Sequence, residues 1–317
     1  MKHIFLINPA AGKDREKKWL IEAIKKAAEK LSLSAEIYFT RGESDAFDYV
    51  SKVAENEEKI RFYACGGDGT FNEVVSAAVG KENVSVGCIP CGTGNDFVKN
   101  FDDINDFLDV EKQLTAEEEK IDVIDADGNY SVNICNMGFD ADVADGVIKF
   151  KRLPKISGNM AYSLSVITSL VKKIGFKAKI ICDGEFKALE NIMMMVVANG
   201  ICYGGGYYGA PKAKINDGLM DVCIVKKLSR FQIAGLIGDY KKGNHLDNPK
   251  FKKYIEYFRC KNIEIESESP FTVSRDGEIS KTEKAVIHII KGGVNFLNPT
   301  IKTTKRSSKN ESIVCQF

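Results

Sequence analysis

The sequence predicts an α/β fold in two parts: an open α/β domain, followed by a mainly antiparallel β domain with inserted helices. Over about the first 120 residues, short β-rich runs alternate with amphipathic stretches, which is typical of βαβ units and a parallel sheet. Beyond that point strands are separated by Asp-Gly pairs, a strong short-range signal for hairpins. The 317 residues suit roughly two domains at ~150 residues each.

The first domain is expected to contain four strands, at residues 4–7, 35–39, 60–65 and 84–89. Apolar residues recur at helical spacing between them, in runs that begin at Leu20, Phe47 and Phe71, with charged residues on the opposite face. Each strand is thus paired with a surface helix, as an open parallel sheet requires.

The second domain is expected to begin with a strand at 121–126, a turn at Asp127-Gly128 and a strand at 130–136. Hairpins are likewise predicted at the Asp-Gly pairs 183–184, 217–218 and 276–277. Helices are predicted near residues 141–150, 158–174 and 229–241. These patterns divide the chain into a first domain at 1–122, a second at 123–299 and a polar, disordered tail at 300–317.

Composition excludes several classes of protein. Lys and Arg (45) balance Asp and Glu (44), so no global field would hold the chain on nucleic acid. Residues 4–7 are too short for a signal-peptide core, and no apolar run reaches the ~18 residues of a membrane span. The nine cysteines lie mostly in apolar runs and suit reduced, buried thiols. We therefore expect a soluble, cytoplasmic protein; a homodimer is left open.

The strongest motif is Gly66-Gly67-Asp68-Gly69-Thr70, which stands directly between a predicted strand and a predicted helix. Glycines allow backbone amides to approach phosphate oxygens, because no Cβ blocks the way. A carboxylate beside phosphates requires a cation between them, so Asp68 implies Mg²⁺. A tight turn with a capping Asp is the competing interpretation, and nucleotide binding is favoured over it.

Two further loops follow strands of the same sheet. Residues 90–96 (PCGTGND) should emerge at the same edge, where Thr93 could donate to phosphate and Asp96 could reinforce the carboxylates; helix capping by Asn95 or Asp96 is the alternative. Residues 8–13 (NPAAGK) are a weaker signal, for which a plain strand-to-helix turn is favoured. Residues 204–209 satisfy GxGxxG, but no helical pattern follows them, which argues against a dinucleotide site.

Taken in order, these motifs resemble those of the bacterial soluble lipid kinases, the diacylglycerol kinase catalytic family that also includes sphingosine and ceramide kinases. The resemblance rests on NPAAGK (8–13), GGDGTFNEV (66–74), PCGTGNDF (90–97), KINDGLMD (214–221) and RDGE (275–278). It runs from residue 1 to about Pro299, although GGDG alone is shared with NAD kinases and phosphofructokinases. It implies transfer of the γ-phosphate of ATP to a lipid hydroxyl, with diacylglycerol giving phosphatidic acid, in a cleft between the two domains that holds ATP and Mg²⁺.

The resemblance also implies roles for particular residues. Asp68, Asp96 and Asp122 correspond to an acidic network around the catalytic Mg²⁺, and Glu278 to the general base. A separate structural Mg²⁺ would be held by the Asp217 carboxylate and the carbonyls of Lys214 and Leu219. The expected ATP contacts are Asn8, Pro9, Ala10, Ala11, Gly12, Thr40, Gly66, Gly67, Asp68, Gly69, Thr70, Phe71, Asn72 and Thr93. Arg275 departs from the smaller or apolar residue expected before Asp276.

Two other functions are left open by the residues. An NAD-kinase-like or other small-molecule kinase of the GGDG group would need a polar acceptor pocket, whereas a lipid needs an apolar one, which the apolar residues of 139–171 permit. A non-catalytic nucleotide sensor would bind ATP without transferring phosphate.

Access to a membrane-borne substrate would need a local contact. Lys149, Lys151, Arg152 and Lys155 cluster around Leu153-Pro154 and could dock on an anionic surface as a peripheral contact at the inner face of the membrane. A solvated loop is the more common explanation for such a cluster. The lipid acceptor and its acyl chains leave no legible motif.

Overall fold

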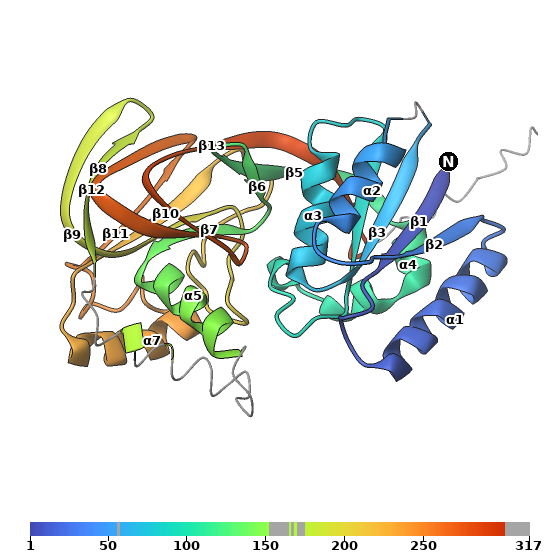
Figure 1. Cartoon of the computed structure of the whole chain (residues 1–317), viewed down its shortest axis with the longest axis horizontal. Helices are drawn as coiled ribbons and strands as arrows, with labels where there is room; N and C mark the ends of the chain where they lie inside the picture. The colour runs from blue at the N-terminus through green and yellow to red at the C-terminus, as the bar shows by residue number, and fades with distance from the viewer. Residues whose placement is uncertain (56–57, 152–164, 166–167, 170–174, 302–317) are drawn as a thin grey trace, which may run out of the picture.

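The computed structural model describes residues 1–55, 58–151, 165, 168–169 and 175–301. It has two lobes joined by two long strands, β5 (Glu117–Ala126) and β13 (Glu278–Asn298), as Figure 1 shows. The mixed α/β fold class predicted from the sequence is confirmed. No helix of the described residues has both the length and the hydropathy to cross a bilayer.

The N-terminal lobe is a parallel sheet with the strand order β4-β3-β1-β2. Its strands confirm the prediction almost residue for residue: β1 (Lys2–Ile7), β2 (Ala35–Phe39), β3 (Ile60–Gly66) and β4 (Val84–Pro90). One face is covered by α1 (Asp14–Lys30) and α4 (Val110–Thr115), and the other by α2 (Asp45–Val53) and α3 (Asp68–Ala78). Buried Leu20, Ile24 and Ala27 confirm the apolar face predicted for α1.

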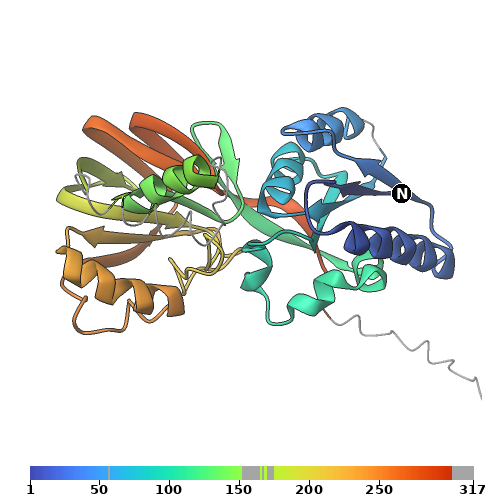
Figure 2. The same ribbon diagram turned by 60° about the horizontal axis from the view of Figure 1, so that its bottom comes forward.

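The C-terminal lobe is antiparallel, with β7 (Ile134–Gly138), β8 (Phe176–Cys182), β9 (Glu185–Ala198), β10 (Met220–Lys226), β11 (Ile255–Cys260) and β12 (Asn262–Arg275). Both β7 and β8 pair with β9 and with β12, so the sheet curls back on itself around an apolar interior. Two helices, α5 (Phe139–Lys151) and α7 (Arg230–Lys242), pack on the same outer face and share one core cluster. Figure 2 shows both helices on this face.

The helices predicted near 141–150 and 229–241 are confirmed as α5 and α7. Most of the helix predicted at 158–174 lies outside the described residues. Residues 302–317 of the predicted tail lie outside them as well.

Three of the four predicted Asp-Gly hairpins are present. Asp127-Gly128 joins β5 to β6 (Asn129–Ser131), Asp183-Gly184 joins β8 to β9, and Asp276-Gly277 joins β12 to β13. Both residues of each pair have positive φ, from 45° to 101°, as a type I′ turn requires.

The hairpin predicted at Asp217-Gly218 is wrong. This pair lies in the loop before β10, and the Gly218 amide donates to the Asp122 carboxylate instead of closing a ladder. The strand predicted at 130–136 is likewise interrupted between β6 and β7. There the amides of Val132 and Asn133 turn toward the Asp276 carboxylate, which takes these two residues out of the strand pairing.

The predicted boundary at 123–299 needs correction at its C-terminal end. The first half of β13 pairs with β12, but the second half returns to the N-terminal lobe, where Asn295 and Phe296 pair with β4. Phe296 packs against Phe71 and Phe97 with ring centroids 6.1 and 5.2 Å away. The apolar pattern of β13 suits either core, so only the long-range pairing reveals its second partner.

Candidate active site

The carboxyl ends of the four parallel strands bring the three predicted loops to one edge of the N-terminal lobe. Asn8, after β1, donates from Nδ2 to the Thr70 hydroxyl at 2.9 Å, which ties the first loop to the start of α3. Thr40 follows β2 at the same edge and is buried. Most of the residues predicted to contact ATP are therefore neighbours in space, although nucleotide binding itself stays a prediction.

Glycines let the loops after β3 and β4 touch backbone to backbone. A Cβ on Gly92 would lie 2.6 Å from the Gly67 Cα, a distance that real Cβ contacts do not show. Gly12 has φ +66°, and a Cβ there would meet the Cys91 carbonyl oxygen at 3.3 Å. The three loops thus form one continuous rim in which side chains at these positions would push the backbones apart.

Asp68 is the first residue of α3 and faces the second loop. Its Oδ1 accepts the backbone amide of Asp96 at 2.6 Å, and a Cβ on Gly94 would lie 2.7 Å from its Oδ2. Burial, and then the nearby Asp96 charge, raise the pKa of Asp68 above its ordinary value. The Phe97 amide also lies 3.4 Å from Oδ1, and the Asp68 side chain lines the cavity described below.

Asp96 links the two lobes. Its Oδ1 accepts from Lys99 Nζ at 2.6 Å, and its Oδ2 accepts from the backbone amide of Gly205 at 2.8 Å. Gly205 lies in a tight loop closed by a bridge between Tyr203 and Tyr207, with no helix after it, which agrees with the rejection of a dinucleotide fingerprint. The glycine-rich segment 204–209 therefore serves to bring a backbone donor to an acidic loop.

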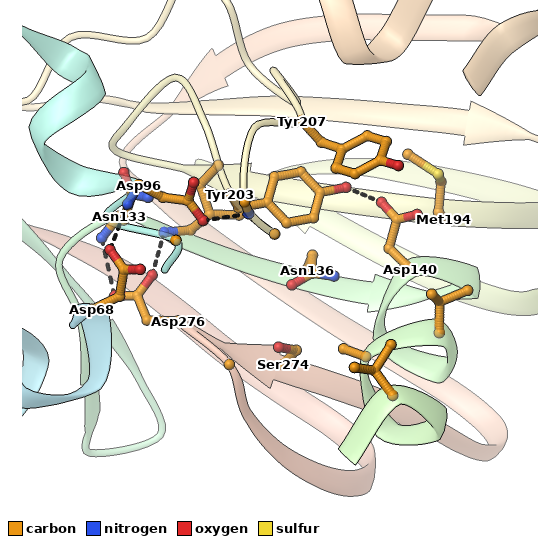
Figure 3. Close-up of a pocket in the computed structure, with 18 of the residues that line it drawn as sticks. Asp68, Asp96, Asn133, Asn136, Asp140, Met194, Tyr203, Tyr207, Ser274 and Asp276 are labelled. Atoms are coloured by element: carbon orange, nitrogen blue, oxygen red, sulfur yellow. Dashed lines mark hydrogen bonds between the residues drawn. The ribbon is translucent and has the colours of Figure 1, made fainter. Parts of the chain in front are cut away.

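A cavity of about 1110 Å³ starts at these loops and continues into the C-terminal lobe. Its polar end is lined by Asp68, Thr93 and Asp96 from the N-terminal lobe and by Asn133 and Asp276 from the other. Figure 3 shows these carboxylates gathered at one end. Residues from both lobes therefore enclose a single space next to the predicted phosphate loops.

The other end of the cavity is apolar. It lies between α5 and α7 on the outer face of the C-terminal sheet, and its lining is aliphatic and aromatic. The apolar lining residues are Phe139, Val143, Ala144, Val147, Ile148, Met193, Met194, Ile233, Leu236 and Ile237. A space with one polar and one apolar end suits an amphiphilic ligand.

One carboxylate lies among these apolar residues. Asp140, in the first turn of α5, accepts a hydrogen bond from the Tyr203 hydroxyl, which also lies 3.4 Å from the Tyr240 hydroxyl (Figure 3). Burial raises the pKa of Asp140 to about 6, and the bond from Tyr203 opposes that rise. The three side chains form a hydrogen-bonding group within the cavity, apart from the phosphate loops.

Glu278, the predicted general base, does not line the cavity. It is the exposed first residue of β13, paired with Arg275, whereas Asp276 and Gly277 before it do line the cavity. The Asp276 carboxylate is occupied by three backbone amides at 2.8 to 3.1 Å, so it holds the loop after β6 in place. Burial raises the pKa of Asp276 to about 6, and these amide bonds oppose the rise.

Asp122 is separated from the acidic pair that it was expected to join. It is buried, and its two oxygens accept the amides of Gly218 and Gly292 at 2.6 and 2.7 Å. Burial raises the pKa of Asp122. It therefore anchors the loop before β10 to β13 and does not line the cavity. The structure brings together Asp68 and Asp96 but not Asp122.

Phe71 and Asn72, two of the expected ATP contacts, have buried side chains, and of the two only Phe71 lines the cavity. Phe71 stacks on Phe97 with ring centroids 4.6 Å apart, and Asn72 donates to the Tyr130 carbonyl across the lobes. Both are buried and hold the base of α3.

Whether Mg²⁺ suits the two predicted sites can be judged from their donors. At the polar end, Asp68 and Asp96 offer two carboxylates beside the phosphate loops, and one or two carboxylates plus phosphate oxygens is the usual Mg²⁺ set. The pair fits. No group of three or more acidic, His or Cys side chains suited to a metal occurs in the described part of the chain, so phosphates would have to complete the shell.

The second predicted site does not fit a cation. Asp217 Oδ2 lies 3.4 Å from the Arg259 guanidinium, which also reaches Asp221 at 3.1 Å and donates to the Lys212 carbonyl at 3.0 Å. Asp217 Oδ1 accepts the Leu219 amide at 3.1 Å. The Arg259 guanidinium already places a positive charge where Mg²⁺ would bind. This guanidinium contacts the Lys212 carbonyl, whereas the expected metal ligand was the Lys214 carbonyl.

Sequence reasoning missed four residues of this region: Asp140, Tyr203, Gly205 and Arg259. The sequence did offer a signal for Gly205, a glycine cluster without a following helix, but gave no partner for it. Asp140 and Tyr203 are 63 residues apart, so no local spacing could have paired them.

Comparison with known proteins gives two matches to family models. Residues 2–126 match the diacylglycerol kinase catalytic domain, and residues 133–297 match the YegS C-terminal NAD kinase beta sandwich-like domain. A diacylglycerol kinase of Bacillus subtilis is 27% identical over 278 residues, which cover 86% of this chain and 88% of that protein.

Two solved structures share the fold. A diacylglycerol kinase from Bacillus anthracis has a TM-score of 0.68 at 22% identity, covering 94% of this chain and 97% of its own. Yeast NADH kinase complexed with NADH has a TM-score of 0.50 at 14% identity, covering 100% of this chain and 90% of its own.

Proposed function

Because the chain belongs to the kinase family defined by the diacylglycerol kinase catalytic domain and the YegS C-terminal domain, we propose that it transfers the γ-phosphate of ATP to the hydroxyl of a membrane lipid, diacylglycerol giving phosphatidic acid. The observation that carries the proposal is the cavity with two unlike ends. A diacylglycerol has one hydroxyl and two acyl chains, and the cavity offers a polar and an apolar end to match.

In this proposal the glycine rim binds the phosphates of ATP through backbone amides and the Thr93 hydroxyl. The acceptor lipid lies with its chains between α5 and α7 and its hydroxyl at Asp68. Asp96 would help the phosphates to hold Mg²⁺, which would offset the charge of the transferring group, and the Asp68 carboxylate is left for the acceptor hydroxyl. Lys99 keeps Asp96 oriented through its 2.6 Å ion pair.

We assign acceptance of the hydroxyl proton to Asp68. Asp68 lines the cavity, and its raised pKa makes it a better base than an ordinary aspartate. The other three cavity carboxylates are less suited, since Asp96 accepts from Lys99 and the Gly205 amide, Asp276 from backbone amides and Asp140 from Tyr203. Glu278 is exposed and is not among the residues that line the cavity, whereas its neighbours Asp276 and Gly277 are.

The proposal is tested by incubating the protein with labelled ATP and mixed micelles of diacylglycerol, ceramide, sphingosine or undecaprenol, and with NAD as a soluble acceptor. Label should appear in a lipid, with diacylglycerol the best acceptor. Label in NAD would support the NAD-kinase-like alternative, which the fold shared with yeast NADH kinase keeps open. ATP binding with no labelled acceptor would indicate a nucleotide sensor.

Glu278→Gln in the same assay separates the two assignments of the base. We expect turnover close to that of the unchanged protein. A loss on the order of 10²-fold or more with ATP affinity kept would return the role to Glu278.

The basic cluster predicted at 149–155 is too little described to support membrane docking. Lys149 forms an ion pair with Asp145, which neutralises it, and Arg152 and Lys155 lie outside the described residues, as does the side chain of Lys151.

A further inference from the structure

The segment around α7 is strongly basic in a chain that is nearly neutral. Residues 226–253 contain eight Lys and Arg against two Asp, whereas the whole chain has a formal charge of +1. Helix α1 provides a comparison, because its 17 residues carry six basic and four acidic side chains in alternation. Most charged side chains of residues 226–253 are therefore positive, whereas basic and acidic side chains alternate along α1.

The bases of this segment are on the outside. Lys227, Arg230, Lys242, Lys252 and Lys253 are all exposed. One of the two acids is turned to structural use: Asp239 accepts from Asn248 Nδ2 at 2.6 Å. Lys226 is neutralised by Glu256 at 2.6 Å, which still leaves an excess of bases in the segment. An outward-facing surface with an excess of positive charge attracts an anionic partner.

The chain after α7 folds back along the helix, so the bases of both stretches lie together. Gln232, in the first turn of α7, donates to the Tyr254 hydroxyl at 3.0 Å, and Asn248 bonds Asp239 near the last turn. Between these two ties, Phe251 packs beside Gly235. We call residues 226–253 the basic α7 segment.

The outer face of α7 is small and apolar between its basic ends. Phe231 is 92% exposed, which is unusual for a large aromatic side chain, and Ala234, Gly235 and Gly238 are exposed further along. Small side chains allow a helix to lie close against a flat surface. An exposed aromatic ring beside Lys and Arg is the composition of helices that lie in the headgroup region of a bilayer.

The inner face of the same helix lines the apolar end of the cavity through Ile233, Leu236 and Ile237. The cavity reaches the surface here, because exposed Lys241 on α7 and Ile148 on α5 are among its lining residues. Figure 2 shows α5 and α7 on one face of the lobe. A surface that held the outer face of α7 would lie next to the opening of the apolar end.

We propose that the basic α7 segment docks on the surface of an anionic lipid bilayer, with Phe231 entering the headgroup region. The bases supply the attraction and Phe231 the apolar contact. Docking does not depend on the proposed lipid kinase activity, since it needs neither ATP nor an acceptor.

The test is flotation of the full chain with vesicles of phosphatidylcholine, alone or mixed with phosphatidylglycerol, without ATP. The protein should float with the mixed vesicles, and added salt should weaken binding. The triple variant Lys227→Gln, Lys242→Gln and Lys252→Gln should reduce partitioning by about 10²-fold, at ~1 kcal/mol for each base near the surface. Phe231→Ser should reduce it by about 10-fold.

Matched variants in other parts of the molecule serve as controls. Lys18→Gln, Lys25→Gln and Lys26→Gln remove three exposed bases from α1, and Phe186→Ser removes an aromatic ring that is 62% exposed. Both controls should float as the unchanged protein does. Equal binding to vesicles without phosphatidylglycerol, or an equal loss in the controls, would overturn the proposal.

Two further measurements separate the outcomes. Binding to a short DNA duplex but not to anionic vesicles would assign the segment to nucleic acid and also overturn docking. In nonionic detergent micelles the Lys227, Lys242 and Lys252 variant should keep the lipid kinase activity of the unchanged protein, because none of these residues lines the cavity. Failure of lipid phosphorylation in both proteins would therefore count against the proposed function and not against docking.

Discussion

The two ends of the cavity are built in opposite ways. The polar end is made by loops that directly follow β1, β3 and β4, where glycines and backbone amides set the geometry. The apolar end is made by two helices, α5 and α7, that are about 80 residues apart in the chain and share one core cluster on the sheet beneath them. The first is a local device that a short motif encodes, whereas the second exists only after the C-terminal lobe has folded.

At the polar end, Asp68→Asn should have the largest effect on the rate of phosphate transfer. Asparagine keeps the shape and can still accept the Asp96 amide, but it cannot accept a proton. We expect kcat to fall by on the order of 10²- to 10⁴-fold with ATP affinity little changed, measured by labelled-phosphate transfer to diacylglycerol micelles. Turnover equal to that of the unchanged protein would exclude Asp68 as the base.

Filling the apolar end should act on the acceptor and leave the nucleotide alone. Ala144→Phe places a ring in the cavity between α5 and α7. We expect KM for a long-chain diacylglycerol to rise by roughly 10- to 100-fold, since each CH₂ that loses its place costs about 0.8 kcal/mol. A short-chain diacylglycerol is the control and should be affected much less. Equal effects on both chain lengths would place the acyl chains elsewhere.

Outside the cavity, Arg259 forms a clamp through its contacts with Asp217, Asp221 and the Lys212 carbonyl. Breaking this arginine clamp should have a moderate effect on stability. Arg259→Gln leaves the buried carboxylate of Asp221 with the Tyr257 hydroxyl as its partner, at 2.6 Å. Because Arg259 itself is partly exposed, we expect a loss of only about 2 kcal/mol in the free energy of unfolding, read from urea denaturation.

The contacts of Arg259 also predict that no Mg²⁺ binds at Asp217. Thermal unfolding of the unchanged protein should not respond to EDTA at the Asp217 loop, because the guanidinium already neutralises that carboxylate. A melting temperature that falls with EDTA, and does not fall in Asp217→Asn, would show that a metal binds there after all.

The last prediction concerns the dependence of stability on pH, which we trace to Asp140. Its folded pKa of about 6 lies above the ordinary value of 3.8, so the fold favours the protonated form. This contribution to stability is complete below pH ~4 and is lost as pH rises through ~6. Relative to Asp140→Asn, the unchanged protein should therefore lose roughly 2 kcal/mol of unfolding free energy between those limits, since each pKa unit corresponds to about 1.4 kcal/mol.

Tyr203→Phe sharpens this measurement. Tyr203 donates to the ionised carboxylate and opposes the rise in pKa, so its removal should move the titration of Asp140 to higher pH. A stability difference that does not change with pH in either variant would contradict the buried titration.

Most of the N-terminal lobe could be predicted from the sequence. Its strands are local β-rich runs, its helices have clear apolar faces, and a parallel sheet fixes which strand ends share an edge. This is why Asp68, Thr93 and Asp96 were correctly expected at one place. The error at Asp122 has the opposite origin, because its amide donors, Gly218 and Gly292, lie 96 and 170 residues further along the chain.

The C-terminal lobe shows how far local signals extend. Asp-Gly pairs correctly marked three turns, because both residues must adopt positive φ and few other pairs do so readily. At Asp217-Gly218 the same signal failed, since the turn is fixed by Asp122 and Arg259 and not by a pair of strands. The motif also did not reveal that Glu278 lies outside the cavity lining while Asp276 and Gly277 belong to it. A motif shows which residues are adjacent in the chain, but it does not show which side of a hairpin faces a cavity.

The sequence by itself determined the parallel sheet, the glycine rim and the family, because glycines and alternating apolar residues act on their immediate neighbours. The tertiary structure decided which carboxylates meet, which end of the cavity is apolar and where β13 ends. These depend on contacts between residues far apart in the chain, whose free energy comes from burial in the folded protein and leaves no periodic trace in the sequence.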